Sequence, residues 1–233
     1  MPPAPPKASK KQIQAIVSVF ETGKASGDPS AVALLQDGAG ISYGSHQGTD
    51  KSGSLDAIVK AYITAKGVFA ANLASYLDRL ATNETAKVDP RDPPEWVEDL
   101  MAQLRLAGGD PIMRTVQEKV FDELYWEPAR EQCEELQLRC PLSWAVVYDS
   151  AIHSGLGGIA TIRKRFSALP PAKGGDEKAW TVAYVEARRA WLLMSKNPIV
   201  QKTVYRCDAF RNLIFDGNWD LITPFKVRGV TVG

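Results

Sequence analysis

Residues 20–23 read Phe-Glu-Thr-Gly, and residues 37–47 read Asp-Gly-Ala-Gly-Ile-Ser-Tyr-Gly-Ser-His-Gln. The first stretch closes an apolar-striped segment and places Glu21 at a helix end, whereas the second is too rich in glycine to be helical. Two carboxylates on separate elements, one protonated and one ionised, are the groups that glycoside hydrolysis requires. The pattern also leaves a simpler interpretation open, in which Glu21 is a solvated surface residue and Asp37-Gly38 is only a turn.

The segment before the first carboxylate is predicted to be a helix from about Ser9, a residue suited to capping, to Glu21. Gly23 is expected to end it. The apolar residues recur with the i, i+3, i+4, i+7 spacing of one helix face at Ile13, Ile16, Val17 and Phe20. Glu21 therefore lies next to a stripe that faces a core.

The second stretch predicts a β-hairpin within residues 31–47, turning at Asp37-Gly38. Strand alternation places Ser42, Gly44 and His46 on one face, and Ile41, Tyr43 and Ser45 on the other. The glycines are expected to leave room for a ligand near the backbone. From residue 53 onward the patterns are mainly helical; residues 144–154 have the look of a buried central helix and residues 155–158 that of a turn. Asp176 is predicted to cap a later helix.

Composition limits the partners of this chain of 233 residues. The formal net charge is +1, so no strong field draws the protein to nucleic acid or to a membrane surface. No apolar run approaches the roughly 18–20 residues of a transmembrane helix, and no classical signal peptide is visible. The Pro-rich residues 1–10 are predicted to be a flexible tail, and residues 11–233 a single domain that is monomeric.

The three cysteines, Cys133, Cys140 and Cys207, are expected to be free and packed, although a bridge between Cys140 and Cys207 stays open. Their spacing is not that of a zinc site, and the two histidines, His46 and His153, do not complete one. We therefore expect no metal and no cofactor.

One acidic residue stands inside an apolar helix: Asp149 follows Ala-Val-Val-Tyr and precedes Ser-Ala-Ile. An aspartate in such a helix is rarely buried unless it is paired. Arg188 and Arg206, on later helices, are available to pair with it. The alternative is that Asp149 faces water.

With these residues in view, the chain resembles the bacterial chitosanases of the lysozyme superfamily, glycoside hydrolase family forty-six. In that family the catalytic Glu ends the first long helix, and the catalytic Asp opens an Asp-Gly-Arg-Gly-Tyr-Thr segment. Glu21 and residues 37–42 take these places, and Ser42 stands where the family's Thr holds the attacking water. The family's ion network behind the acid implies the set Asp149, Arg188 and Arg206 here.

The chain departs from the family pattern within the same segment. Ala39 replaces the family's Arg, Ile41 replaces its Tyr, and residues 42–47 do not follow the usual chitosanase continuation. These changes fall where sugar units are read, so they bear on the substrate more than on the chemistry. Tyr43, His46 and Gln47 are the candidates for sugar contacts.

The resemblance implies a mainly α (α+β), two-lobed lysozyme-like fold with a cleft between the lobes. A small β-hairpin lobe, about residues 24–50, is expected to form one wall. The implied activity is inverting, endo-acting hydrolysis of a β-1,4-linked amino-sugar polymer, with Glu21 as general acid, Asp37 as general base and Ser42 orienting the water.

Charge directs the choice of substrate. Chitosan is a polycation and favours acidic enzymes, whereas this chain is near neutral. The leading expectation is therefore peptidoglycan, cleaved at the cell wall or outside the cell by a muramidase such as a phage lysin or a secreted effector. The alternative is a chitosanase acting on chitosan. A third hypothesis, from another class, is an inactive carbohydrate-binding module on the same fold.

Overall fold

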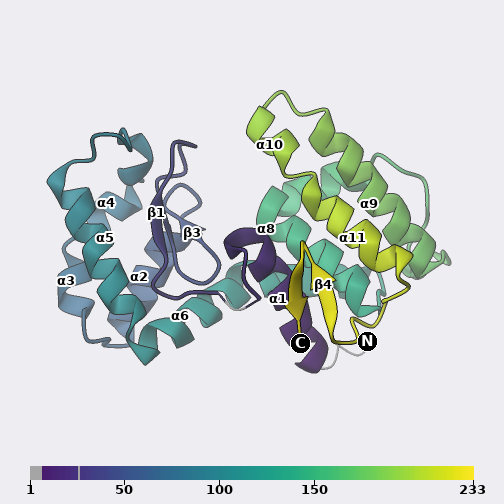
Figure 1. The fold of residues 1–233 in the computed structure, drawn as a ribbon, viewed down its shortest axis with the longest axis horizontal. Coiled ribbons are helices and arrows are strands. Elements are labelled where there is room, and N and C mark those ends of the chain that lie inside the picture. Colours follow the sequence, from purple (N-terminus) through teal and green to yellow (C-terminus); the bar gives the residue numbers. More distant parts are fainter. Residues whose placement is uncertain (1–6, 26) are drawn as a thin grey trace. The chain divides into compact units, whose positions relative to one another are not determined.

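The computed structural model describes residues 7–25 and 27–233, which divide into two compact units (Figure 1). Unit 1 comprises Met1–Ala25 and Tyr125–Gly233, and unit 2 comprises Ser26–Leu124. The predicted lobe of residues 24–50 is therefore too small, because the helices that follow the hairpin up to residue 124 belong to the same unit. That residues 11–233 form a single two-lobed domain stays a prediction.

Unit 2 begins with the predicted hairpin. In the described part of the chain, β1 (Val32–Leu34), β2 (Ile41–Tyr43) and β3 (Gly48–Thr49) form an antiparallel sheet with β2 in the centre. Val32 pairs with Tyr43 and Leu34 with Ile41, so the connection contains Asp37-Gly38. Gly38 has a φ of +72°, a left-handed conformation that glycine adopts without strain.

Helices complete unit 2. They are α2 (Ser54–Thr64), α3 (Ala70–Ala74), α4 (Leu77–Ala81), the 3₁₀ turn Thr85–Lys87, α5 (Glu95–Gly108) and α6 (Pro111–Phe121). The helix α2 packs against α6, and α5 packs against β1. Asp110 caps α6 by accepting the Ile112 N–H at 2.9 Å, with proline in the first helical position.

A π-helical turn, Asp122–Trp126, follows α6, and the chain passes from unit 2 to unit 1 within it. Unit 1 contains α1 (Lys7–Thr22), α7 (Glu127–Glu135), α8 (Pro141–Arg163), the 3₁₀ turn Pro171–Lys173, α9 (Glu177–Leu193), α10 (Pro198–Lys202), α11 (Tyr205–Phe215) and the antiparallel pair β4 (Phe225–Val227) and β5 (Val230–Val232). Asp176 caps α9 as predicted, accepting the Ala179 N–H at 2.7 Å.

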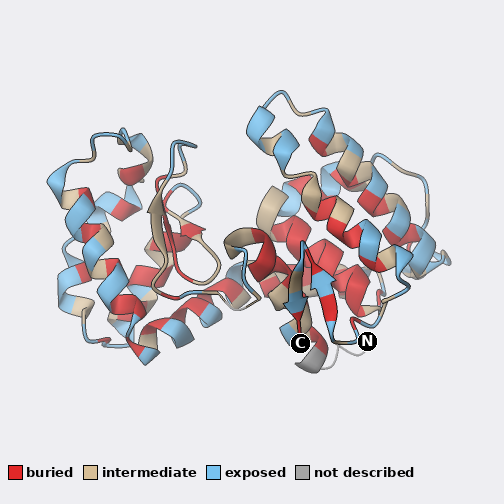
Figure 2. Cartoon of the chain, in the orientation of Figure 1, coloured by how far each residue is buried: buried red, intermediate tan, exposed pale blue. Residues whose placement is uncertain are grey.

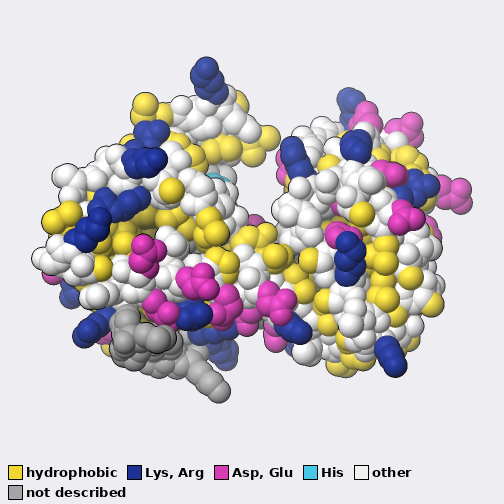
Figure 3. Space-filling model, turned by 180° about the vertical axis from the view of Figure 1, so that it is seen from behind, with side chains coloured by type: hydrophobic (Ala, Val, Ile, Leu, Met, Phe, Trp, Pro, Cys, Tyr) yellow, Lys and Arg dark blue, Asp and Glu magenta, His cyan; other side chains and the backbone are white. Residues whose placement is uncertain are grey.

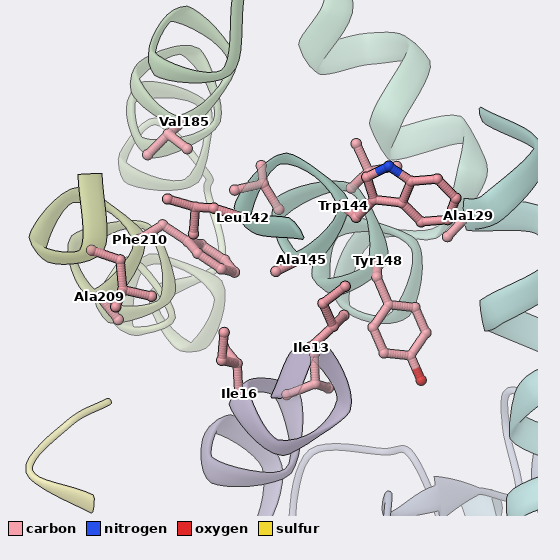
Figure 4. Close-up of a cluster of buried hydrophobic side chains, with 14 of the residues drawn as sticks. Ile13, Ile16, Ala129, Leu142, Trp144, Ala145, Tyr148, Val185, Ala209 and Phe210 are labelled. Atoms are coloured by element: carbon pink, nitrogen blue, oxygen red, sulfur yellow. The ribbon is translucent and has the colours of Figure 1, made fainter. Parts of the chain in front are cut away.

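The helix α8 is the centre of unit 1. Every residue from Pro141 to Ala151 is buried, which makes this stretch continuously red in Figure 2. The helices α1, α7, α9 and α11 all pack against it or against its neighbours. Figure 4 shows Ile13 of α1 directed at Ala145 and Tyr148 of α8, and Ile16 directed toward Phe210 of α11. The apolar stripe of α1 is thus used as the sequence pattern predicts.

Two helix boundaries differ from the sequence prediction. The helix α1 begins at Lys7, so Ser9 lies within it and is buried rather than being the cap. Residues 7–10 are thus helical, and the predicted tail can concern only residues 1–6, which lie outside the described residues. In α8, Gly155 alone leaves the helical conformation, with φ 68° and ψ 170°, and the helix resumes to Arg163 where a longer turn was predicted.

The surface carries charges of both signs. Figure 3 shows Lys and Arg side chains interspersed with Asp and Glu over the visible face of each unit, in agreement with the net charge of +1. Within residues 7–25 and 27–233, no helix has the length and apolar character needed to cross a membrane.

Candidate active site

Glu21 lies in the last turn of α1, as the sequence predicts. The helix ends because Gly23 adopts a φ of +73° and donates its N–H to the Val19 carbonyl at 3.0 Å. Phe20, the preceding residue, is buried in the core, while the Glu21 side chain keeps 20% of its exposure. This position leaves a carboxylate at the surface of unit 1 with its backbone fixed by the core.

A chain of ion pairs runs from Glu21 into the interior of unit 1. Arg206 of α11 donates through Nη2 to Glu21 Oε1 and through Nη1 to Asp149 Oδ1, the latter at 2.6 Å. Arg188 of α9 donates to the other Asp149 oxygen, also at 2.6 Å. Asp149 and Arg188 are fully buried, and Arg206 is 4% exposed. Asp149 therefore lies between two arginines, one of which also holds Glu21.

The electrostatics of this cluster are set by burial and by pairing. Burial opposes ionisation of Asp149, but Arg188 and Arg206 outweigh it and hold the pKa of the carboxyl below its usual range. The same carboxylate, with Glu21, raises the pKa of Arg206 although burial acts to lower it. Asp149, Arg188 and Arg206 are therefore charged at neutral pH, with the carboxylate lying between the two guanidinium groups.

Asp37 lies in unit 2, on the exposed connection between β1 and β2. Its Oδ1 accepts the Ala39 N–H at 2.9 Å, which orients the carboxylate over its own turn. Gly38 and Gly40 both have positive φ, so the chain can turn sharply on either side of Ala39. The two candidate carboxylates are thus supplied by different units.

Ser42 lies five residues beyond Asp37, on the central strand β2. It pairs with Ala33 of β1 and with Thr49 of β3, and it is 5% exposed. The sheet therefore fixes the backbone of the residue predicted to hold the water.

Gly40 and Gly44 do not leave the room for a ligand that was predicted, whereas a Cβ at Gly38 would meet no atom within 4 Å. A Cβ at Gly44 would lie 2.4 Å from the Gln117 Oε1 atom, and one at Gly40 would lie 2.5 Å from the Thr85 hydroxyl oxygen. Gln117 also accepts the Ser45 N–H at 3.0 Å. At these two positions the space is occupied by side chains of unit 2, which hold the hairpin in place.

Tyr43 is a packing residue rather than the predicted sugar contact. Its side chain is completely buried, and burial raises the pKa of its hydroxyl. Ile41, on the same strand face, is also completely buried. The strand alternation that places Tyr43 on the same face as Ile41 could have predicted this burial, because a strand face that carries an isoleucine usually faces the core.

His46 and Gln47, the other two candidates, are half-buried and turned toward their own unit. The His46 ring packs on Phe121 with centroids 4.7 Å apart. Burial lowers the pKa of His46 to about 4, partly offset by Asp122. Gln47 donates its side-chain amide to the Gly44 carbonyl at 3.0 Å. Both side chains stabilise the loop, and their role toward a sugar stays a prediction.

The two histidines are expected to make the folded protein less stable in acid. The pKa of His153 is also lowered to about 4, first by burial and then by Arg206 and Arg188. A histidine whose folded pKa lies below its unfolded value of 6.5 stabilises the fold fully above pH 6.5. That stability is lost as the pH falls from 6.5 toward 4, by on the order of 1–2 kcal/mol per histidine at pH 5. Denaturant titrations at pH 7 and pH 5 measure this loss.

The matched variant is His46→Gln, which cannot titrate. Its loss of stability between pH 7 and pH 5 is expected to be smaller than that of the wild type, whatever its stability at pH 7. Equal losses in the two proteins would contradict the assignment of a neutral imidazole with a lowered pKa to His46.

Cys133, Cys140 and Cys207 are all free thiols, so the bridge left open between Cys140 and Cys207 is not formed. Among the residues that the structure describes, no group of three or more His, Cys, Asp or Glu side chains is arranged to hold a metal ion.

Comparison with known proteins defines the class and then the family. The fold is that of the solved chitosanases, so the chain is a glycosidase of the mainly helical, lysozyme-like type. Residues 15–225 match the model of glycosyl hydrolase family 46. The chain belongs to this family.

Individual relatives agree with that assignment. The chitosanase of Bacillus subtilis (strain 168) is 29% identical over 238 residues, covering 97% of this chain and 84% of the relative. The solved structure of a mutant chitosanase from Bacillus subtilis MY002, complexed with 6 GlcN, superposes with a TM-score of 0.84 at 26% identity, covering 96% of this chain and 95% of the other. The Gynuella sunshinyii chitosanase complexed with chitotetraose has a TM-score of 0.83 at 24% identity, covering 97% of each chain; this last likeness concerns the fold alone.

Proposed function

We propose that this protein is an endo-acting chitosanase that hydrolyses the β-1,4 linkages of chitosan. The observation that carries the proposal is the similarity to chitosanases over 97% of the chain, including a related structure solved with 6 GlcN. Peptidoglycan, the leading expectation from charge, has no such support. Net charge governs long-range association, whereas the substrate is selected by contacts at the site. A polymeric substrate also implies action outside the cell.

The two carboxylates have complementary roles in this proposal. Glu21 gives its proton to the glycosidic oxygen, and the bond between that oxygen and the anomeric carbon breaks. Asp37 takes a proton from a water held by Ser42, and the water oxygen bonds to the anomeric carbon from the opposite face. Each proton passes between a named carboxyl and an oxygen of the reaction, and no further group is required. Arg206 keeps the Glu21 carboxyl in place through its Nη2 hydrogen bond.

A panel of polymers tests the substrate. The protein is incubated separately with chitosan, chitin and purified peptidoglycan, and the new chain ends are identified by mass spectrometry. We expect glucosamine oligomers of mixed length from chitosan and an early fall in viscosity, as internal cleavage produces. Turnover of peptidoglycan without turnover of chitosan would restore the muramidase hypothesis. Binding without turnover of any polymer would favour the inactive binding module.

The stereochemistry is a further prediction. A nucleophile in direct attack needs no hydroxyl to hold a water for its first step, whereas a general base does, and Ser42 lies on a rigid strand five residues from Asp37. We therefore expect inversion, so the first product from a β-linked chain is the α-anomer. Proton NMR of the anomeric signals, recorded in the first minutes before mutarotation, measures it. A β-anomer appearing first would remove Asp37 from the role of base.

A further inference from the structure

One buried carboxylate has no role in the proposed mechanism. It lies next to the backbone of the segment from Asp37 to Ser42. It belongs to Asp50, the residue after β3, whose side chain has no exposed surface. Its partner is Thr85, the first residue of the 3₁₀ turn after α4, which is 1% exposed. Both residues belong to unit 2, as does the whole segment that they contact.

The pair is built from short hydrogen bonds. Thr85 donates to Asp50 Oδ2 twice, through its hydroxyl at 2.7 Å and through its backbone N–H at 3.0 Å. The Thr85 hydroxyl oxygen in turn accepts the backbone N–H of Ile41 at 3.0 Å. Since the hydroxyl proton is directed at Asp50, the oxygen lone pairs are free to accept from Ile41. The carboxylate thereby fixes the orientation of the threonine hydroxyl.

The Asp50–Thr85 pair also bonds the backbone carbonyl of Ile41. The Asp50 backbone N–H donates to the Ile41 carbonyl at 3.0 Å, and the next N–H along the chain, that of Lys51, donates to the Ala39 carbonyl at 3.0 Å. Ile41 therefore has both of its backbone groups bonded to the Asp50–Thr85 pair. Ile41 immediately precedes Ser42 and lies four residues after Asp37, so the pair fixes the backbone between the proposed base and the proposed water-holding hydroxyl.

Packing shows how closely the pair approaches this backbone. A Cβ at Gly40 would lie 2.5 Å from the Thr85 hydroxyl oxygen and 3.0 Å from the Asp50 Cβ, so only glycine fits there. On another side of the segment, a cavity of about 380 Å³ is lined by residues that include Gly38, Gly40 and Thr85. The backbone of this segment is therefore approached closely by the pair, with open space beside Gly38.

We infer that Asp50 and Thr85 are positioning residues, which set the geometry between Asp37 and Ser42 for attack by water; this inference rests on the proposed function. A displacement of about 1 Å of a catalytic group can lower a rate by about 100-fold. The pair touches no reacting atom in this scheme, so its loss acts on kcat more than on KM.

The test removes only the hydroxyl that links the two elements. Thr85→Val keeps the shape of the side chain and leaves the Ile41 N–H without its acceptor, whereas Thr85→Ser keeps the hydroxyl. We expect Thr85→Val to lower kcat on chitosan about 10- to 100-fold with KM within about threefold of wild type. Thr85→Ser is expected to retain kcat within about threefold. Thr85→Ala replaces Thr85→Val in the test if the valine variant does not fold.

Tyr62 supplies a matched control in the same unit. Its hydroxyl donates to the Asp110 carboxylate at 2.6 Å and accepts the Phe69 N–H at 3.2 Å. Like the Thr85 hydroxyl, it thus links a carboxylate to a backbone N–H, but in a different part of the chain. Tyr62→Phe should lower the melting temperature in the way that Thr85→Val does. It should leave kcat unchanged at a temperature at which both variants are folded.

A second readout does not depend on activity. Amide hydrogen exchange of residues 39–43 is expected to quicken in Thr85→Val and to stay at the wild-type rate in Thr85→Ser and Tyr62→Phe. Unchanged exchange in Thr85→Val would overturn the inference, and so would faster exchange with an unchanged kcat. A wild type that hydrolyses no chitosan would instead overturn the proposed function, and kcat would then be measured on whichever polymer of the panel it hydrolyses.

Discussion

Replacing Glu21 with glutamine is expected to lower kcat on chitosan by at least about 10²-fold, because the side chain keeps its shape but has no proton to give to the leaving oxygen. The fold should persist. Glutamine retains an acceptor for the Arg206 Nη2 group, and the backbone of this position is fixed by Phe20 in the core and by the turn at Gly23. Steady-state kinetics and a thermal melt, measured on the same preparation, separate the two effects.

The chain offers a matched control for the Glu21 variant. Glu186 of α9 also forms an ion pair with an arginine, Arg211, at 2.7 Å, but both side chains are about half exposed. Glu186→Gln makes the same chemical change in another arginine pair, so it should leave kcat within about twofold of wild type. Activity of Glu21→Gln within a few-fold of wild type would remove Glu21 from the role of acid.

Asp37, the proposed base, also has a matched control in the chain. Asp28, like Asp37, is exposed, belongs to unit 2 and accepts the N–H two residues further on at 2.9 Å, in this case from Ser30. Asp37→Asn and Asp28→Asn thus alter the same local geometry in the same way. We expect a loss of kcat of at least about 10²-fold for the first and none for the second. Similar kinetics for the two variants would mean that Asp37 only forms a turn.

Periodic patterns predicted much of the fold. The stripe of α1, the hairpin across Asp37-Gly38, the cap at Asp176 and the buried stretch of α8 are local features, and each follows from a spacing or a residue type within one segment. The extent of unit 2 was not predictable in this way, because it depends on which helices pack together. The packing of α2 on α6 joins segments whose first residues, Ser54 and Pro111, are 57 positions apart.

The same distinction applies to the site. Glu21, Asp37 and Ser42 were found from short motifs, but Thr85 lies 44 residues from the Ile41 N–H that it accepts, and no local pattern connects them. Tyr43 was misplaced for a different reason. The family resemblance placed residues 42–47 where sugar units are read, and this expectation outweighed the strand alternation that put Tyr43 beside the buried Ile41. The prediction of the substrate rested on the net charge of the whole chain, which carries no information about contacts at the site.

Asp149→Ala is expected to cost roughly 3–5 kcal/mol of unfolding free energy, because it leaves the buried Arg188 and the nearly buried Arg206 without their shared counter-charge. The sequence alone left open whether Asp149 faces water, in which case the cost would be within about 0.5 kcal/mol. For a chain of this size the larger value corresponds to a fall in melting temperature of roughly 6–20 °C. Denaturant titration at pH 7 measures the free energy directly.

Two further variants assign the cause of that loss. Asp149→Asn keeps the volume and removes only the charge, so a loss that persists in this variant arises from electrostatics rather than from a cavity. Asp208→Ala breaks ion pairs with Arg189 at 2.7 Å and Arg211 at 3.6 Å on the exposed side of α11, where such pairs contribute at most about 1 kcal/mol. If Asp149→Ala cost no more than Asp208→Ala, the buried arginines would not depend on Asp149. Arg206 could then hold Glu21 without Asp149, and the ion network would have no part in positioning the Glu21 carboxyl.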